Sequence, residues 1–535
     1  MSQQETVKIT QKPGIFECIG NYLCSPGRQF TVQSAAPTQF INKNADDAVQ
    51  EIAIIGSDIP NNDSIYNEAN RKSIGARIFD FLTDFAGSSL MFLLTCAILV
   101  GWAIAGGILG APDEWQIAMQ DGSSIQCYYS DSLLMRQQQN HCNRLLTIIA
   151  QLRSRSATFD KLLRSTQTNN PSLSSSELND LANKIPEDSV GDAANLPTEN
   201  AYDEICNWAS NAVGSLWALI VYMGGIFAWI GVGHSLGFSD EWQLYINTGV
   251  AVELTFTSMF LQNTRRRHMN YLEKCLKSIQ QADINLEIRL RKTSGDNTPN
   301  PIVSIHPHPV SRGIRIIDYY GDVIGTGLGL FISVCVFIAW FAIGNVMEFS
   351  DGWWLIIGTY TGLVGFVDGF VLRNVYFRQD KLLDEQFDVL IDNDKAIFQY
   401  LNLYLPEQNN FKERSFSERL SNKMGDICAH PLAVLFSFVV VIGLICVASG
   451  MQWNTTGQLL CNTPTMIIEG FLLIVLLHAH NMSNTNRRVQ MHDILVRRLR
   501  LLQFTRTMTG SDSSPVVIDE MDLTGLHVTE KKHQA

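Results

Sequence analysis

Six ionisable side chains lie in stretches where the sequence predicts membrane-spanning helices. They are Asp121, Asp131, Glu253, Asp368, Glu469 and His480. A charged group is costly to place in a bilayer, so such residues mark ion or proton pathways by default. Carboxylate oxygens and imidazole nitrogens suit Fe(II), Mn(II) and Zn(II), and the sequence carries no geometry that separates these metals. We therefore take the six as candidate metal ligands.

Each stretch carries its polar residues on one helical face. Successive helical residues are 100° apart, so positions three, four or eleven apart lie close together on the wheel. Glu253 shares a face with Thr257, and Asp368 shares one with Thr361 and Gly365. The longer stripes are Gln120, Ser124, Cys127 and Asp131 in one stretch, and Asn462, Thr465, Glu469 and His480 in another. One polar stripe per stretch predicts that these helices face a common axis.

Structural roles compete with metal binding at several of these positions. Asp368 is followed by Arg373, so the two could form an ion pair near a helix end. Glu253 and Glu469 lie in mid-span, where a purely structural role is harder to sustain. Asp121 and Asp131 matter only if the polar stretch 115–136 is embedded in the membrane.

The helices that must position these residues follow a repeating pattern. Glu114–His141, Glu241–His268 and Asp351–Arg378 align without gaps, and a looser fourth copy runs from about Asp426 to Asn481. Three tryptophans, at 102, 229 and 340, each stand thirteen residues before a second one. Internal repeats of this length decide the fold. We predict an all-α polytopic membrane protein with about eight transmembrane helices, arranged as four parallel-repeat hairpins.

Lysine and arginine positions support this count. The turns 111–115, 237–242, 347–353 and 452–458 contain no basic residue, whereas every connection on the other side contains several. Basic loops stay in the cytosol, so both termini are expected there. The expected order is a disordered cytosolic tail (1–70), hairpins at 75–140, 206–268, 316–378 and 426–482, cytosolic connections at 141–205 (with a helix), 269–315 and 379–425, and a C-terminal cytosolic tail (483–535).

Composition excludes several classes of protein. Hydrophobic residues make up 46% of the 535 residues, and the eleven cysteines include no C-x-x-C pair, which argues against a zinc module or disulfide scaffold. Basic residues flank the spans rather than forming one patch, so no nucleic acid is expected as a partner. No cleaved signal peptide is expected in 1–70. The expected partners are the lipid bilayer and divalent metal ions; a homo-oligomer is compatible with the sequence but not indicated by it.

Two further patterns suggest packing roles. Small residues let membrane helices approach closely, and four glycines recur at near-helical spacing: Gly358, Gly362, Gly365 and Gly369. Acidic residues also begin two of the first helices of the hairpins, where they are expected to complement the helix dipole. These are Asp80, Asp84, Asp318 and Asp322.

Long strings of this sequence resemble the fungal low-affinity iron permeases. The resemblance covers most of residues 75–505. It is carried by MQDGSSIQ (119–126), YINTGVAV (245–252), DVIGTG (322–327), WWLIIGTYTGLVGFVDGFVLR (353–373), TTGQLLCNTPTMIIE (455–469) and AHN (479–481). It implies low-affinity uptake of ferrous iron across the plasma membrane, with leakage to zinc, copper and manganese. It implies no enzyme activity and no cofactor, since the metal is the transported substrate.

The chain departs from the family pattern at three points. The family is usually described with about six spans, not eight. The resemblance implies a second acid directly after Glu469, where this chain has Gly470, and a small or hydroxyl residue in place of Glu253. Three other functions stay open: a divalent cation channel, a membrane metalloenzyme using Glu469 and His480, and a metal sensor without flux.

Overall fold

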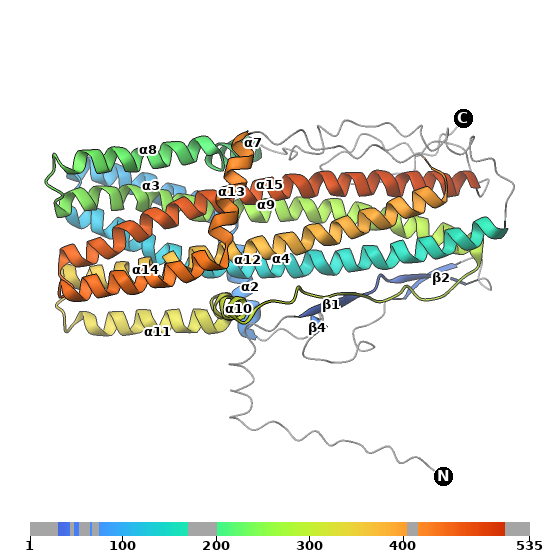
Figure 1. Cartoon of the computed structure of the whole chain (residues 1–535), viewed down its shortest axis with the longest axis horizontal. Helices are drawn as coiled ribbons and strands as arrows, with labels where there is room; N and C mark the ends of the chain where they lie inside the picture. Colours follow the sequence, from blue (N-terminus) through green and yellow to red (C-terminus); the bar gives the residue numbers. More distant parts are fainter. Residues whose placement is uncertain are drawn as a thin grey trace, which may run out of the picture.

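The computed structural model describes residues 30–42, 48–52, 65–66, 74–169, 201–403 and 416–508. Expectations for the other parts of the two tails, and for the Ser-rich part of the first connection, lie outside these residues. Within them the chain is helical apart from short strands (Figure 1). The helices are α2 (Ile74–Ala86), α3 (Ser89–Leu109), α4 (Asp113–Asn169), α7 (Ala201–Val213), α8 (Leu216–Gly233), α9 (Asp240–Ser294), α10 (Arg312–Ile324), α11 (Gly327–Gly344), α12 (Asp351–Tyr400), α13 (Phe416–Ala429), α14 (Pro431–Gly450) and α15 (Thr455–Met508).

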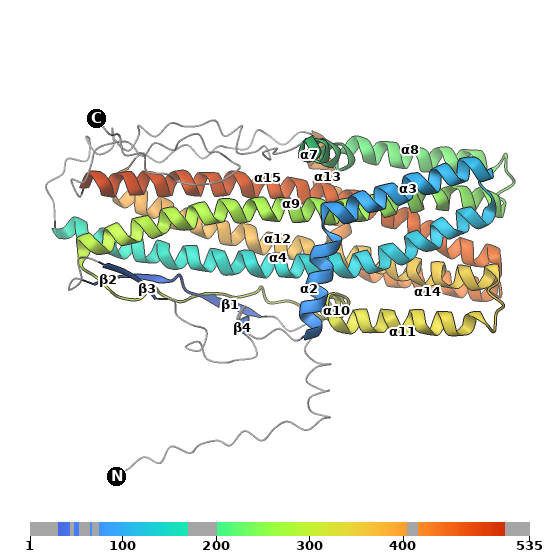
Figure 2. The same ribbon diagram turned by 180° about the vertical axis from the view of Figure 1, so that it is seen from behind.

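In the part of the chain that the structure describes, seven helices are long and apolar enough to cross a membrane: α3, α8, α9, α11, α12, α14 and α15. The long helices α9, α12 and α15 have 55, 50 and 54 residues. At 1.5 Å per residue they are roughly 75 to 80 Å long, more than twice a ~30 Å hydrocarbon core. The molecule therefore has a membrane half, which contains α3, α8, α11 and α14, and an extramembrane half built from the continuations of the long helices (Figures 1 and 2).

The four long helices form a closed inner ring. α4 packs against α9 and α12, and α15 packs against the same two helices. Two pairs of helices therefore face each other across the ring: α4 faces α15, and α9 faces α12. The shorter apolar helices α3, α8, α11 and α14 lie outside the ring, and their outward side chains are largely exposed, as expected of surfaces that meet lipid. A side chain that reaches from one helix to its opposite partner must pass the axis of this ring.

α4 belongs to the inner ring although it is too polar to count among the seven apolar helices. Its polar side chains bond to α9 instead of facing lipid. Gln120 Nε2 donates to Thr248 Oγ1 at 3.1 Å, and Gln126 Nε2 donates to Ser258 Oγ at 2.9 Å. Ser123 Oγ donates to the Ala251 carbonyl at 2.7 Å. The first half of α4 is thus covered by its neighbours, which is the condition that its polarity requires.

Paired tryptophans join three outer helices to the long helices that follow them. Trp229 and Trp242 stack with ring centroids 3.9 Å apart, and each indole Nε1 donates to the other residue's carbonyl, at 2.8 and 2.9 Å. The same reciprocal arrangement links Trp102 to Trp115 and Trp340 to Trp353. In the first pair, a Cβ added at Gly106 would overlap the Trp115 ring. Each pair thus joins the end of an outer helix to the start of the long helix that follows it.

We expect Trp242→Ala to lower the free energy of unfolding by about 3 kcal/mol, because it removes the aromatic stacking contact with Trp229 and the hydrogen bond that its indole Nε1 donates. Trp208→Ala is the matched control, since that side chain is 72% exposed. Thermal unfolding of the two detergent-purified variants measures the difference. Equal melting temperatures would show that the pair does not hold the hairpin together.

Four short helices cross the bundle where its two halves meet (Figures 1 and 2). They are α2, α7, α10 and α13. Asp80 on α2 accepts hydrogen bonds from Arg136 Nε at 2.7 Å and from Asn140 Nδ2 at 2.8 Å. Asp318 on α10 forms an ion pair with Arg378. The predicted role of these acids as helix-dipole partners is therefore wrong for Asp80 and Asp318, which fasten short helices to long ones instead.

The extramembrane half has a buried core with ion pairs inside it. Arg498 Nε lies 3.0 Å from Asp283 Oδ1, Arg498 Nη1 lies 2.9 Å from Asp394 Oδ1, and none of the three side chains is exposed. Burial raises the pKa of Asp283 to about 6, while Arg498 acts to lower it. Asp283 therefore remains largely ionised at neutral pH. The pairs tie α9, α12 and α15 together.

Five short strands lie along the extramembrane half, beside α4 and α9. β1 (Thr31–Ser34) pairs antiparallel with β5 (Val303–Ile305) and parallel with β4 (Ile65–Tyr66), and β2 (Thr38–Asn42) pairs with β3 (Ala48–Ile52). The expectation of a disordered segment 1–70 is wrong for these strands. These short segments contain no long apolar run, so little in the sequence indicates a strand there.

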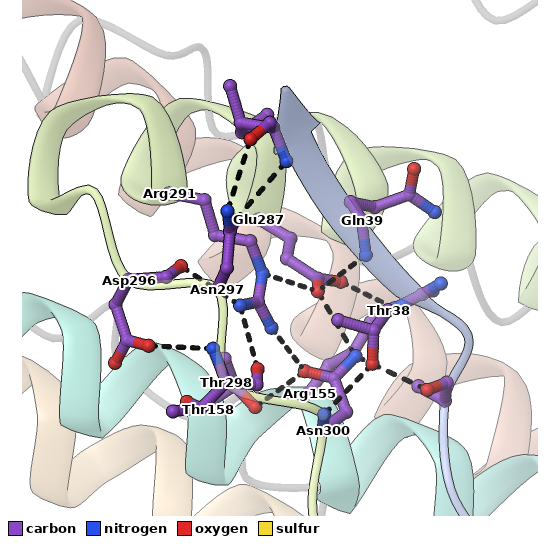
Figure 3. A network of polar contacts seen from close by, with 12 residues as sticks. Thr38, Gln39, Arg155, Thr158, Glu287, Arg291, Asp296, Asn297, Thr298 and Asn300 are labelled. Carbon is purple, nitrogen blue, oxygen red and sulfur yellow. Dashed lines mark hydrogen bonds and ion pairs between the residues drawn. The ribbon is translucent and has the colours of Figure 1, made fainter. Parts of the chain in front are cut away.

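A buried polar network fastens β2 to α9 (Figure 3). Glu287 Oε1 accepts hydrogen bonds from Arg291 Nε at 2.9 Å, Asn300 Nδ2 at 3.1 Å and the Gln39 backbone N–H at 3.1 Å. Glu287 Oε2 also lies 3.3 Å from Arg155 Nε. The Glu287 carboxylate thus connects α4, α9, the loop after α9 and strand β2.

Glu287→Ala is expected to cost about 3–5 kcal/mol of stability, because it leaves buried charged partners uncompensated. Glu273→Ala serves as control: it breaks the exposed ion pair with Arg144, and such pairs are worth about 0–1 kcal/mol. Thermal unfolding and protease sensitivity of the N-terminal strands would report the difference. The interpretation fails if the two variants unfold alike.

Candidate metal pathway

Each helix of the inner ring contributes at least one carboxyl group to the interior of the membrane half. Asp131 comes from α4, Glu253 from α9, Asp368 from α12 and Glu469 from α15. Asp131 and Glu469 lie near each other although their helices are opposite in the ring, and both lie near Asp368. Glu253 lies near Glu469. We call these four residues the carboxyl cluster, and it lies at the axis of the ring.

The carboxyl cluster has few protein partners. Tyr320 OH donates to Asp368 Oδ1 at 2.7 Å, and Thr257 Oγ1 donates to Glu253 Oε1 at 2.8 Å. The second oxygens of these two carboxyls, together with Asp131 Oδ2 and Glu469 Oε1, are buried without a hydrogen-bond partner. None of the four residues forms an ion pair with a basic residue in the described chain, so the expected alternative pairing of Asp368 with Arg373 does not occur. Unpaired buried acceptors of this kind are what an entering cation would satisfy.

The glycine stripe of α12 faces the polar stripe of α15. A Cβ added at Gly365 would lie 2.9 Å from Glu469 Oε2, and one at Gly362 would lie 2.5 Å from Asn462 Oδ1. The glycines, predicted to allow close packing, let α12 approach the polar side chains of α15. Without side chains on α12 at these positions, the oxygens of α15 can reach the axis.

Glu253 occupies the space beside Gly470. A Cβ at Gly470 would lie 2.5 Å from Glu253 Oε2 and 2.6 Å from the Tyr222 hydroxyl, which itself donates to the Ile467 carbonyl at 2.7 Å. Glu253 on α9 therefore places its carboxyl group at the level of the residue that follows Glu469 on α15.

Asp121 lies closer to the turns that carry the tryptophan pairs. It is 3% exposed and precedes Asp131 on α4 by ten residues, or about 15 Å. Its Oδ1 would lie 2.6 Å from a Cβ at Gly358 on α12, and its Oδ2 has no hydrogen-bond partner. Asp121 thus lies on the side of the carboxyl cluster that faces the tryptophan pairs.

Sequence reasoning missed Asn247. This side chain is fully buried, and neither its Oδ1 nor its Nδ2 has a hydrogen-bond partner. The signal was present, because an asparagine in the otherwise apolar stretch YINTGVAV is costly unless it faces the bundle interior.

His480 lies apart from the carboxyl cluster. It follows Glu469 on α15 by eleven residues, or about 16 Å, and its Nε2 lies 3.1 Å from Nδ1 of His268. The two rings stack with centroids 5.1 Å apart. His480 therefore lies nearer the extramembrane half, among basic side chains rather than acidic ones.

The described residues contain no group of three or more His, Cys, Asp or Glu side chains close enough to hold a metal ion together. The carboxyl cluster is a group of separate acidic side chains rather than a tight metal cage. Such a group suits an ion that must enter and leave, because a permeant ion has to be bound weakly enough to be released.

Comparisons with known proteins identify the family. Three segments, residues 202–294, 314–404 and 417–534, match the family described as "Low affinity iron permease". The chain belongs to this family. It is 50% identical over 514 residues to the "Low-affinity iron/zinc ion transport protein fet4" of Schizosaccharomyces pombe, covering 93% of this chain and 87% of that protein.

A second relative of the low-affinity iron permease family supports the assignment. The chain is 39% identical over 541 residues to the "Low-affinity Fe(2+) transport protein" of Saccharomyces cerevisiae, covering 91% of this chain and 97% of that protein. No solved structure matches the chain. The resemblance seen in the sequence is confirmed, and the chain is a multi-pass membrane protein of this family.

Proposed function

We propose that this protein is a low-affinity permease that carries Fe(II), and with it zinc, across the membrane. The observation that carries the proposal is the near full-length similarity to the two transport proteins, at 50% and 39% identity. The carboxyl cluster at the axis of the inner ring supports it, because it offers oxygen ligands where an ion would cross. Copper and manganese, which take similar ligands, are the next substrates to test.

We propose that the path begins at Asp121, passes the carboxyl cluster and ends toward the extramembrane half. All six residues predicted from the sequence lie on inner-ring helices, with His480 last. Carboxylates and a transported ion attract each other strongly where water is scarce. The membrane potential suffices as a driving force: a divalent ion gains about 4.6 kcal/mol per 100 mV on entry.

The proposed topology is eight spans, as four hairpins that run the same way, in the plasma membrane with both termini in the cytosol. Three hairpins share the reciprocal tryptophan pairs, and the first half of α4 packs in the ring with the three apolar long helices. The extramembrane half carries the basic connections, which favours a cytosolic location. Parallel repeats relate the hairpins by an axis along the membrane normal.

The direct test is radioactive Fe(II) uptake by cells that lack their own iron transporters. Cells expressing the protein are expected to take up iron faster than cells carrying an empty vector, and excess zinc is expected to compete. Uptake equal to that of the empty vector, with the protein confirmed at the cell surface, would reject the proposal.

A divalent cation channel is the second candidate, because four inner helices surround one axis. The same assay separates the two: a carrier saturates with rising Fe(II), whereas flux through a channel continues to rise over a wider range. Either result excludes a sensor that binds metal without flux.

A further inference from the structure

We infer that Arg265 is the gate residue at the cytosolic end of the metal path, and that it closes the path by its positive charge. The inference rests on the proposed function and adds a residue that sequence reasoning did not single out. Arg265 lies on α9, two turns beyond Thr257 and Ser258.

Arg265 crosses the axis of the inner ring. Its guanidinium carbon lies 5.3 Å from the centroid of the Tyr376 ring on α12, the helix opposite α9. Its Nη1 lies 3.5 Å from the Leu134 carbonyl on α4. A side chain that starts on one helix and contacts both its neighbour and its opposite partner fills the centre of the ring.

The charge of Arg265 is buried and largely unpaired. The residue is 2% exposed, and neither Nε nor Nη2 has a hydrogen-bond partner. No carboxylate in the described chain forms an ion pair with it. A buried charge without a partner costs several kcal/mol, so its presence on the axis needs an explanation other than stability.

The side chains around Arg265 are buried as well. Tyr376 and His480 are buried at the same level, and a Cζ–centroid distance of 5.7 Å places Arg373 on the same tyrosine. The next layers toward the cytosol contain fully or nearly fully buried leucines. These are Leu145, Leu272 and Leu383. The three leucines belong to one apolar core, which an ion enters only at a high cost, so we place the exit of the ion near the level of Arg265.

Arg265 lies close enough to the carboxyl cluster to act on an ion held there. Tyr376 follows Asp368 on α12 by eight residues, or about 12 Å along the helix. In an environment poor in water, charges at this distance interact far more strongly than in bulk solvent. A divalent ion at the carboxyl cluster is thus attracted from one side and repelled from the other until the guanidinium leaves the axis.

The test compares Arg265→Gln, Arg265→Met and Arg265→Lys in the Fe(II) uptake assay at matched surface expression. Both neutral variants are expected to raise the initial rate by about tenfold, which corresponds to about 1.4 kcal/mol in the barrier. The lysine variant keeps the charge and is expected to stay close to the parent protein. Arg266→Gln is the matched control, because its side chain is on the same helix but donates to the Asp84 carbonyl, away from the axis.

Each outcome decides the inference. Neutral variants that transport no faster than the parent would overturn it, and so would a lysine variant as fast as the glutamine variant. If neither neutral variant reaches the cell surface, Arg265 is a structural residue and the gate is rejected. Failure of the proposed function gives a different result, since the parent protein itself would then not exceed the empty vector.

Discussion

Glu469→Gln is expected to lower the initial rate of Fe(II) uptake by about 10- to 100-fold at matched surface expression, the range seen when metal sites lose a supporting partner. Glutamine keeps the shape of the side chain and removes its charge. Glu469 is the member of the carboxyl cluster that lies near all three others, so its loss removes the central acid of the group.

The control for Glu469→Gln is Glu273→Gln, which removes an exposed carboxylate in the extramembrane half. Glu253→Gln is expected to have a smaller effect than Glu469→Gln, because Glu253 is only partly buried and interacts with one other member of the carboxyl cluster. Unchanged uptake and unchanged zinc competition in both variants would make these acids structural. The search would then move to Asp121 and Asp131.

The carboxyl cluster was largely predictable because a helix has a fixed period. Asp131, Asp368 and Glu469 were each placed on the polar face of a stretch, and polar faces in a membrane protein turn toward each other rather than toward lipid. The structure brings these three together with Glu253. It does not bring Asp121 or His480 to the same level, since residues on one face can still lie 15 Å apart along the axis.

Other features depend on contacts between distant segments, which no local pattern specifies. The position of Asp80 near an expected helix start fits the role of a dipole partner. In the structure, its carboxylate instead accepts a hydrogen bond from Arg136, which lies 56 residues further along the chain. The strand at Thr38–Asn42 pairs with β3 and is held against α9 by Glu287, more than two hundred residues away, which accepts a hydrogen bond from Gln39. In the sequence, Arg265 is one of several basic residues that follow a span. Its contacts with α12 and α4, which depend on how the four long helices pack, bring it to the axis of the ring.

Gly365→Ala is expected to reduce Fe(II) uptake by about tenfold, the lower end of the range for a displaced metal ligand. The added Cβ would lie 2.9 Å from Oε2 and 3.0 Å from Oε1 of Glu469. That is too close for the carboxyl group to remain where it is, so the side chain must turn away from the axis. Alanine is about 1 kcal/mol more favourable than glycine inside a helix, so the variant should fold, and its melting temperature should change little.

Gly249→Ala is the control, since a Cβ there meets no atom within 4 Å. Loss of uptake at Gly365 without loss of stability would mean that transport depends on where the Glu469 carboxyl points. Equal uptake by the two variants would contradict this dependence, because the carboxyl would then function equally well from a displaced position.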